Sequence, residues 1–174
     1  FAEYFARAEA AGIPILWHVN DPEEFWDPEK TPGWAKERGW GYDETFVAKE
    51  QLYAEVENVL CRHPRLKIIF AHFYFLSDDL PRAAQLLDRY PGVNLDLAPG
   101  IEMLYNFAKR PKEAREFFLT YQDRIVFGTD FFTTALLSRV WVMRNFLETD
   151  ERFHVPTDDS HLSPDGHRIV AGEI

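Results

Sequence analysis

The sequence has a single cysteine, a shortage of basic residues and no long apolar run, and each shortage excludes a class of protein. Cys61 stands alone among 174 residues, so no disulfide can form within the chain. With 19 Lys and Arg against 29 Asp and Glu, the net charge of −10 argues against nucleic acid and membranes as partners. The apolar stretch 68–76 is too short to span a bilayer.

The lone cysteine also bears on location. We interpret Cys61 as a structural residue in a reducing compartment, and with no secretory signal visible we expect the protein to be cytoplasmic. The hydrophobic share of 46% predicts a well-packed chain, and its length suits one domain over 1–174. Because the chain opens inside an apparent helix and stops without a terminating turn, we expect an incomplete domain, a piece of a longer protein.

Apolar strands alternate with amphipathic helices along most of the chain. Short β-rich runs occupy 13–19, 66–72, 93–99 and 124–130, with helical patterns over 1–12, 44–64, 79–90, 101–121 and 136–147. Pro111 either starts a second helix in its region or kinks the first. The alternation predicts an α/β fold with a parallel sheet. Four strand–helix units fit either a small doubly wound domain or half of an eight-stranded barrel.

A long connection, residues 20–43, follows the first strand and is rich in aromatic residues. It holds Phe25, Trp26, Trp34, Trp40 and Tyr42 among prolines and glycines. These side chains suit a lid or wall over an organic substrate, and they equally suit packing of the loop onto the sheet. The two interpretations are compatible.

Three of the four predicted strands finish on residues that bind metals or move protons: His18, His72 and Asp130. The carboxyl ends of parallel strands share one rim, so we expect these side chains to converge. Taken singly, each histidine suits an ordinary interior residue, and Asp130 suits a helix cap. Asp96 of the remaining strand is interpreted as structural or as a support for the site.

This mix of side chains suits a divalent metal. Imidazole nitrogen and carboxylate oxygen are normal ligands of Zn²⁺ and similar ions. A catalytic site keeps one position open for a water, whose proton a nearby carboxylate can accept and which a histidine can orient. The alternative is an unrelated doubly wound α/β domain, in which the three residues would not converge.

The segments 13–26, 71–72 and especially DRIVFGTDFF at 123–132 resemble the metal-dependent hydrolases of the amidohydrolase superfamily. The branch with the greatest similarity contains aminocarboxymuconate-semialdehyde and related decarboxylases. The resemblance implies a partial TIM (β/α)8 barrel, with this chain supplying strands five to eight and their helices. It implies His18 as a metal ligand, His72 as a catalytic residue beside the metal-bound water, and Asp130 as both metal ligand and proton acceptor.

The family also places a His-x-His pair on its first strand, and no such pair occurs here. We expect that pair to lie upstream of Phe1, so the chain alone would hold metal poorly and turn over little. The expected cofactor is a divalent ion, most simply zinc. The expected reaction is hydrolysis of a small organic acid, amide or ester; the alternatives are non-oxidative decarboxylation of a small carboxylic acid and a degenerate, non-catalytic barrel.

Two further expectations concern the surface. Four strands cannot close a barrel, so exposed edges favour association of the chain into a homo-oligomer. The polar tail after residue 150 carries His154, His161 and His167, which we interpret as surface loop rather than as a second metal site.

Overall fold

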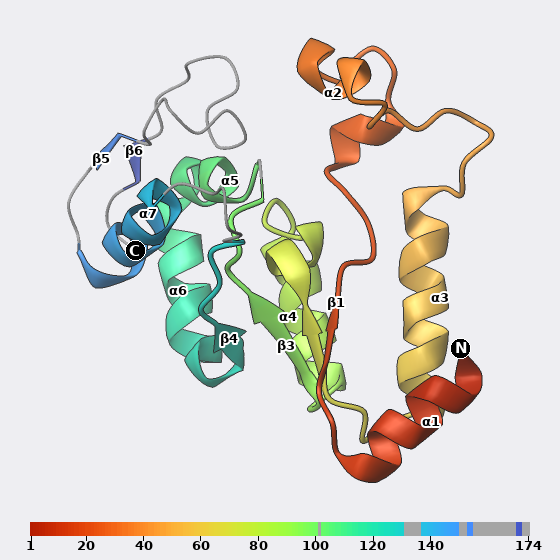
Figure 1. The fold of residues 1–174 in the computed structure, drawn as a ribbon. Coiled ribbons are helices and arrows are strands. Elements are labelled where there is room, and N and C mark those ends of the chain that lie inside the picture. The colour runs from red at the N-terminus through yellow and green to blue at the C-terminus, as the bar shows by residue number, and fades with distance from the viewer. Residues whose placement is uncertain (101, 131–136, 150–152, 155–169, 172–174) are drawn as a thin grey trace.

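The computed structural model describes residues 1–100, 102–130, 137–149, 153–154 and 170–171. Helix α1 spans Ala2–Ala11, followed by β1 (Ile15–Trp17), the short helices η1 (Glu23–Trp26) and α2 (Gly33–Glu37), and α3 (Lys49–Arg62). Strand β2 (Ile68–Phe70), the turn η2 (Ala71–Phe75), α4 (Leu80–Arg89) and β3 (Val93–Asp96) come next. The chain continues through α5 (Met103–Lys109), α6 (Pro111–Tyr121), η3 (Gln122–Arg124), β4 (Ile125–Val126) and α7 (Ser138–Glu148), and β5 (Phe153–His154) pairs with β6 (Val170–Ala171) (Figure 1).

In the described part of the chain, β1 to β4 form one parallel sheet in sequence order. Ile15 pairs with Ile68, which pairs with Val93, and Leu95 pairs with Ile125. Consecutive parallel neighbours joined by helices are the arrangement predicted from the sequence. A partial barrel agrees with this order and remains a prediction.

The strands are shorter than predicted, while most helices begin and end near the expected residues. Gly12 ends α1 with φ 65°, a left-handed conformation that glycine adopts without steric cost. The Asp79 side chain accepts the backbone N–H of Arg82 at 3.1 Å and so caps α4. Pro111 is the first residue of α6, which decides between the two roles considered for it.

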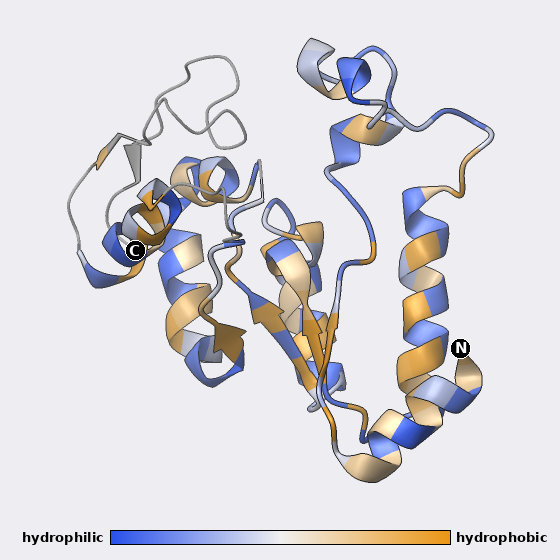
Figure 2. Ribbon diagram, viewed as in Figure 1, coloured by the Kyte–Doolittle hydropathy of each residue, from blue (hydrophilic) through white to orange (hydrophobic). Residues whose placement is uncertain are grey.

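One face of the sheet is packed against helices, and the other is more open. Ile68, Phe70, Val93 and Leu95 are fully buried, whereas Leu16, whose side chain points to the opposite face, is 66% exposed. Figure 2 shows the apolar strands beside helices that carry both apolar and polar residues. A sheet covered on one face is what half of a closed barrel would present.

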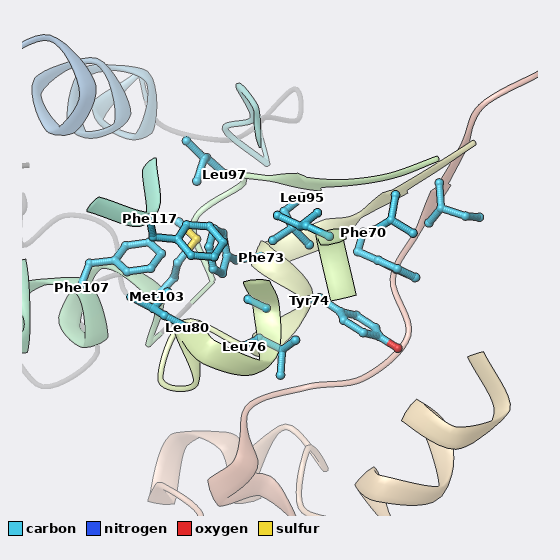
Figure 3. Packing of buried hydrophobic residues seen from close by; sticks show 14 of the residues in the cluster. Phe70, Phe73, Tyr74, Leu76, Leu80, Leu95, Leu97, Met103, Phe107 and Phe117 are labelled. Atoms are coloured by element: carbon cyan, nitrogen blue, oxygen red, sulfur yellow. The ribbon is translucent and has the colours of Figure 1, made fainter. Parts of the chain in front are cut away.

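The core continues from the sheet into the helices after it. Phe73 lies edge-on to Phe107, with ring centroids 5.0 Å apart, and also packs against Phe117 (Figure 3). Phe70 stacks on Tyr74 at 4.0 Å. These aromatic contacts join the turn after β2 to α5 and α6, and therefore fix the end of β2 where His72 lies.

Helix α7 differs from the prediction. The sequence predicts for this helix an apolar stripe of Leu136, Leu137, Val140, Trp141 and Leu147. The residues that it buries are Arg139, Val142, Met143 and Phe146, whereas Leu137, Trp141 and Leu147 are exposed. Leu136 lies outside the described residues, as do His161 and His167 of the tail. From the sequence we interpreted the tail as surface loop, but part of it forms the β5–β6 pair. No helix in the described ranges is long and apolar enough to cross a membrane.

Candidate active site

A pocket of about 290 Å³ lies beyond the carboxyl ends of the parallel strands. Its wall includes residues that follow all four strands: His18 after β1, His72 after β2, Pro99 and Gly100 after β3, and Asp130 after β4. The three residues predicted from strand ends therefore share one cavity. They lie just beyond the strands rather than inside them, because β1, β2 and β4 end at Trp17, Phe70 and Val126.

His18 is the more exposed of the two histidines that line the pocket. Its ring meets His72 edge to face with centroids 5.1 Å apart, and its Nε2 lies 3.9 Å from Oδ1 of Asp21. Burial, with the neighbouring His72 as the next cause, lowers the pKa of His18, while the carboxylates of Asp21 and Asp130 act in the opposite direction. A neutral imidazole, the form that binds metals, is thereby favoured.

His72 stands in a strained turn. His72, Phe73, Tyr74 and Phe75 all have positive φ, between 53° and 57°. Left-handed backbone costs roughly 1–2 kcal/mol per non-glycine residue, so the surrounding contacts must hold this turn in place. One such contact joins the His72 ring to the loop after β3, where Nδ1 lies 3.0 Å from the carbonyl oxygen of Ala98.

Asp130 follows β4 in a left-handed conformation, with φ 49°. Its Oδ2 accepts a hydrogen bond from Arg139 of α7 at 2.9 Å, and its carbonyl oxygen accepts another at 3.2 Å. The Arg139 side chain is 5% exposed and that of Asp130 is 48% exposed. The aspartate thus has one oxygen bonded to a buried cation while much of its carboxylate faces the pocket.

The connection after β1 supplies the aromatic wall. Phe25, Trp40 and Tyr42 line the pocket, and the Tyr42 hydroxyl donates to Oδ2 of Asp21 at 2.5 Å. Burial raises the pKa of Tyr42, so its hydroxyl keeps its proton. Trp34 packs edge-on against Trp40 at 5.8 Å, away from the pocket. The aromatic residues therefore pack against one another within the connection, and three of them line the pocket.

Three charged residues in or near the pocket, Lys49, Glu102 and Arg139, were not predicted from the sequence. Lys49 at the start of α3 is buried, and its Nζ lies 3.4 Å from Oε2 of Glu23. Burial lowers the pKa of Lys49. Both carboxyl oxygens of Glu102 are buried without a hydrogen-bond partner in the described part of the chain, and burial raises its pKa to about 7. A carboxyl group in the loop after a strand was a usable signal for Glu102. Lys49 and Arg139 gave none, because both look like ordinary exposed helix residues.

The residues of the pocket suit a divalent ion in kind but not in number. Among the described residues, no group of three or more His, Cys, Asp or Glu stands close enough to hold a metal ion. His18 and Asp130 offer two protein ligands, whereas catalytic zinc usually has three. The His154 side chain and the other tail histidines lie outside what the structure describes, so a second site there stays untested.

A parallel sheet with polar side chains at one rim defines a class: α/β proteins whose sites are built beyond the strand ends. A family model described as amidohydrolase matches residues 1–152, so the chain belongs to the amidohydrolase family. No curated protein and no solved structure matches the chain significantly. The family assignment agrees with the resemblance seen in the sequence, while the decarboxylase-containing branch and the position within a barrel remain predictions.

Proposed function

We propose that this chain carries part of the active site of a metal-dependent hydrolase that cleaves a small organic acid, amide or ester at a carbonyl group. The observation that carries the proposal is the shared pocket of His18, His72 and Asp130, which come from three different strand ends. Family membership supports an enzyme of the amidohydrolase type. His18 and Asp130 would hold the ion, together with donors beyond the described residues.

A bound divalent ion, for which we propose zinc, would polarise a carbonyl and lower the pKa of a water to about 7. The chain's own groups then have separate tasks. The Asp130 carboxylate accepts a proton from the attacking water, and Arg139 keeps that carboxylate oriented at 2.9 Å. His72 accepts a hydrogen bond from the attacking water and so orients it, and the aromatic wall of Phe25, Trp40 and Tyr42 orients the substrate.

One observation favours a second candidate reaction, non-oxidative decarboxylation. Arg139 lines the pocket, and its guanidinium, although it is 5% exposed and bonded to Asp130, adds positive charge beside the site that favours a substrate carboxylate. Both reactions use the same wall, and they differ in whether the substrate's carboxylate is retained or released as CO₂.

The test is zinc loading followed by elemental analysis of the wild type, His18→Ala and Asp130→Ala. His63→Ala is the matched control, because His63 lies beside Glu9 at the end of α3, away from the pocket. We expect weak loading of the wild type, a loss of about tenfold or more in affinity with either site variant, and no change with the control. Hydrolysis of p-nitrophenyl acetate should follow the same order. Equal loading of all four proteins would refute the proposed metal ligands.

To separate the two reactions, the zinc-loaded protein is given a panel of small carboxylic acids and of amides. CO₂ released only by protein with an intact Asp130 supports decarboxylation. Amide cleavage with the same dependence supports hydrolysis, and neither product under full zinc loading would favour the non-catalytic interpretation.

A further inference from the structure

The His72 ring is tied to the neighbouring strand by contacts that meet at Asp96. Asp96 is the last residue of β3, next to β2 in the sheet, and its side chain is buried. One oxygen, Oδ1, accepts the backbone N–H of His72 at 2.8 Å and the backbone N–H of Ala98 at 3.0 Å. A single carboxylate oxygen thus joins the loops that follow two adjacent strands.

The third side of this arrangement is the contact between the His72 ring and Ala98. Nδ1 of His72 lies 3.0 Å from the Ala98 carbonyl oxygen. A backbone carbonyl has no proton to donate, so Nδ1 must carry the hydrogen in this contact. In the neutral ring, Nε2 then has the lone pair. Asp96, Ala98 and His72 therefore form a closed circuit of hydrogen bonds that fixes both backbone and ring.

The backbone of His72 needs such support. β2 ends at Phe70, and His72 begins the run of four residues with positive φ. The Asp96 oxygen accepts its N–H in place of a partner within the sheet, and by holding the Ala98 N–H it also fixes the carbonyl that contacts Nδ1. Loss of Asp96 would release both ends of the circuit at once.

We propose that Asp96 is a positioning residue that holds the His72 ring as the Nδ1–H tautomer and leaves Nε2 as the acceptor for a ligand in the pocket. The usefulness of this orientation rests on the proposed function, in which His72 serves the reaction. The orientation itself does not depend on the proposed function, because it can be measured in the metal-free protein without a substrate.

The experiment is ¹⁵N NMR of the histidine rings in metal-free protein at a pH where His72 is neutral, with His72→Gln to assign the signal. The variants are Asp96→Asn, which keeps an acceptor oxygen, and Asp96→Ala, which removes it. Asp79→Ala is the matched control, because Asp79 also accepts a backbone N–H through Oδ1 but does so at the start of α4. It removes a comparable bond away from the pocket.

We expect the Nδ1–H tautomer in the wild type, in Asp96→Asn and in Asp79→Ala. Asp96→Ala removes both bonds that hold the Ala98 carbonyl opposite the ring. The ratio of Nδ1–H to Nε2–H tautomer should then fall by about tenfold, the effect of losing the hydrogen bond between Nδ1 and that carbonyl. An Nε2–H tautomer in the wild type, or an unchanged ratio in Asp96→Ala, would overturn the proposal. So would an Asp96→Asn variant that behaves like Asp96→Ala.

If Asp96→Ala does not fold, the wild type and Asp96→Asn still decide. The proposal then requires the Nδ1–H tautomer and slow amide exchange of His72 and Ala98 in both proteins, and rapid exchange of either amide would overturn it. Failure of zinc to bind would sink the proposed function and leave this result untouched, so the two failures are distinguishable.

Discussion

The rings of His18 and His72 meet edge to face with their centroids 5.1 Å apart, although they follow different strands. This contact couples a proposed metal ligand to a proposed catalytic residue. Zinc added to the protein should therefore change the His18 ring signals first and shift those of His72 through the contact. His63, which lies beside Glu9, should not respond. Ring-detected NMR during a zinc titration measures all three, and an equal response of His63 would point to non-specific binding.

The Glu102 carboxyl predicts a fall in stability between acidic and neutral pH. Burial raises its pKa from 4.5 to about 7, so the folded protein binds this proton more tightly than the unfolded chain does. Its contribution is fully present below about pH 4.5 and is lost as the pH rises through about 7, by at most about 3 kcal/mol. Glu102→Gln should flatten the curve over that window, as measured by urea unfolding at several pH values. Glu116→Gln, exposed on α6, should leave the slope unchanged.

Because Asp130 forms an ion pair with Arg139, we expect Asp130 to contribute to the stability of the fold as well as to the site. Asp130→Asn keeps the shape but removes the charge beside a buried guanidinium. Because the Asp130 side chain is about half exposed, we expect a loss of only about 1–2 kcal/mol in the free energy of unfolding. Urea denaturation measures the loss, and a more stable Asp130→Asn would show that this ion pair does not support the fold.

Gly128 lies close to the backbone of Ala98, and we expect this close approach to fix the position of Asp130 two residues later. A Cβ added at Gly128 would lie 2.7 Å from the backbone nitrogen of Ala98, closer than side-chain carbons approach other atoms. Gly128→Ala should therefore push β4 away from β3, cost about 2 kcal/mol in stability and weaken zinc loading. Gly33→Ala is the control, since a Cβ there meets nothing within 4 Å. Equal stability of the two variants in urea would contradict the close approach.

The open face of the sheet predicts self-association. Leu16 is 66% exposed on β1, which among the described residues pairs with β2 alone. An apolar side chain on an uncovered sheet favours contact with a second copy. Leu16→Lys should shift the protein toward monomer in sedimentation equilibrium. Leu119→Lys, an exposed leucine on α6, should leave the association constant unchanged. A wild type that stays monomeric at high concentration would remove the basis for this prediction.

Some of the fold follows from local pattern alone. The apolar runs around Ile15, Ile68, Val93 and Ile125 became the four parallel strands, because such runs have few ways to bury themselves other than a covered sheet. Gly12 ends α1 and Asp79 begins α4 through signals that act within a few residues, so such helix ends can be read from the sequence alone. The stripe of α7 was wrong, because Arg139 turned inward to meet Asp130 instead of an apolar neighbour.

The sequence by itself determined the alternation of strands and helices, the family, and the three polar residues that follow β1, β2 and β4. Only the tertiary structure decided what surrounds them: the left-handed turn at His72, the Asp96 oxygen that holds it, and the buried carboxyl of Glu102. The physical reason is range. Strand and helix patterns depend on neighbours within one or two turns, whereas these contacts join residues that become neighbours only once adjacent strands have paired.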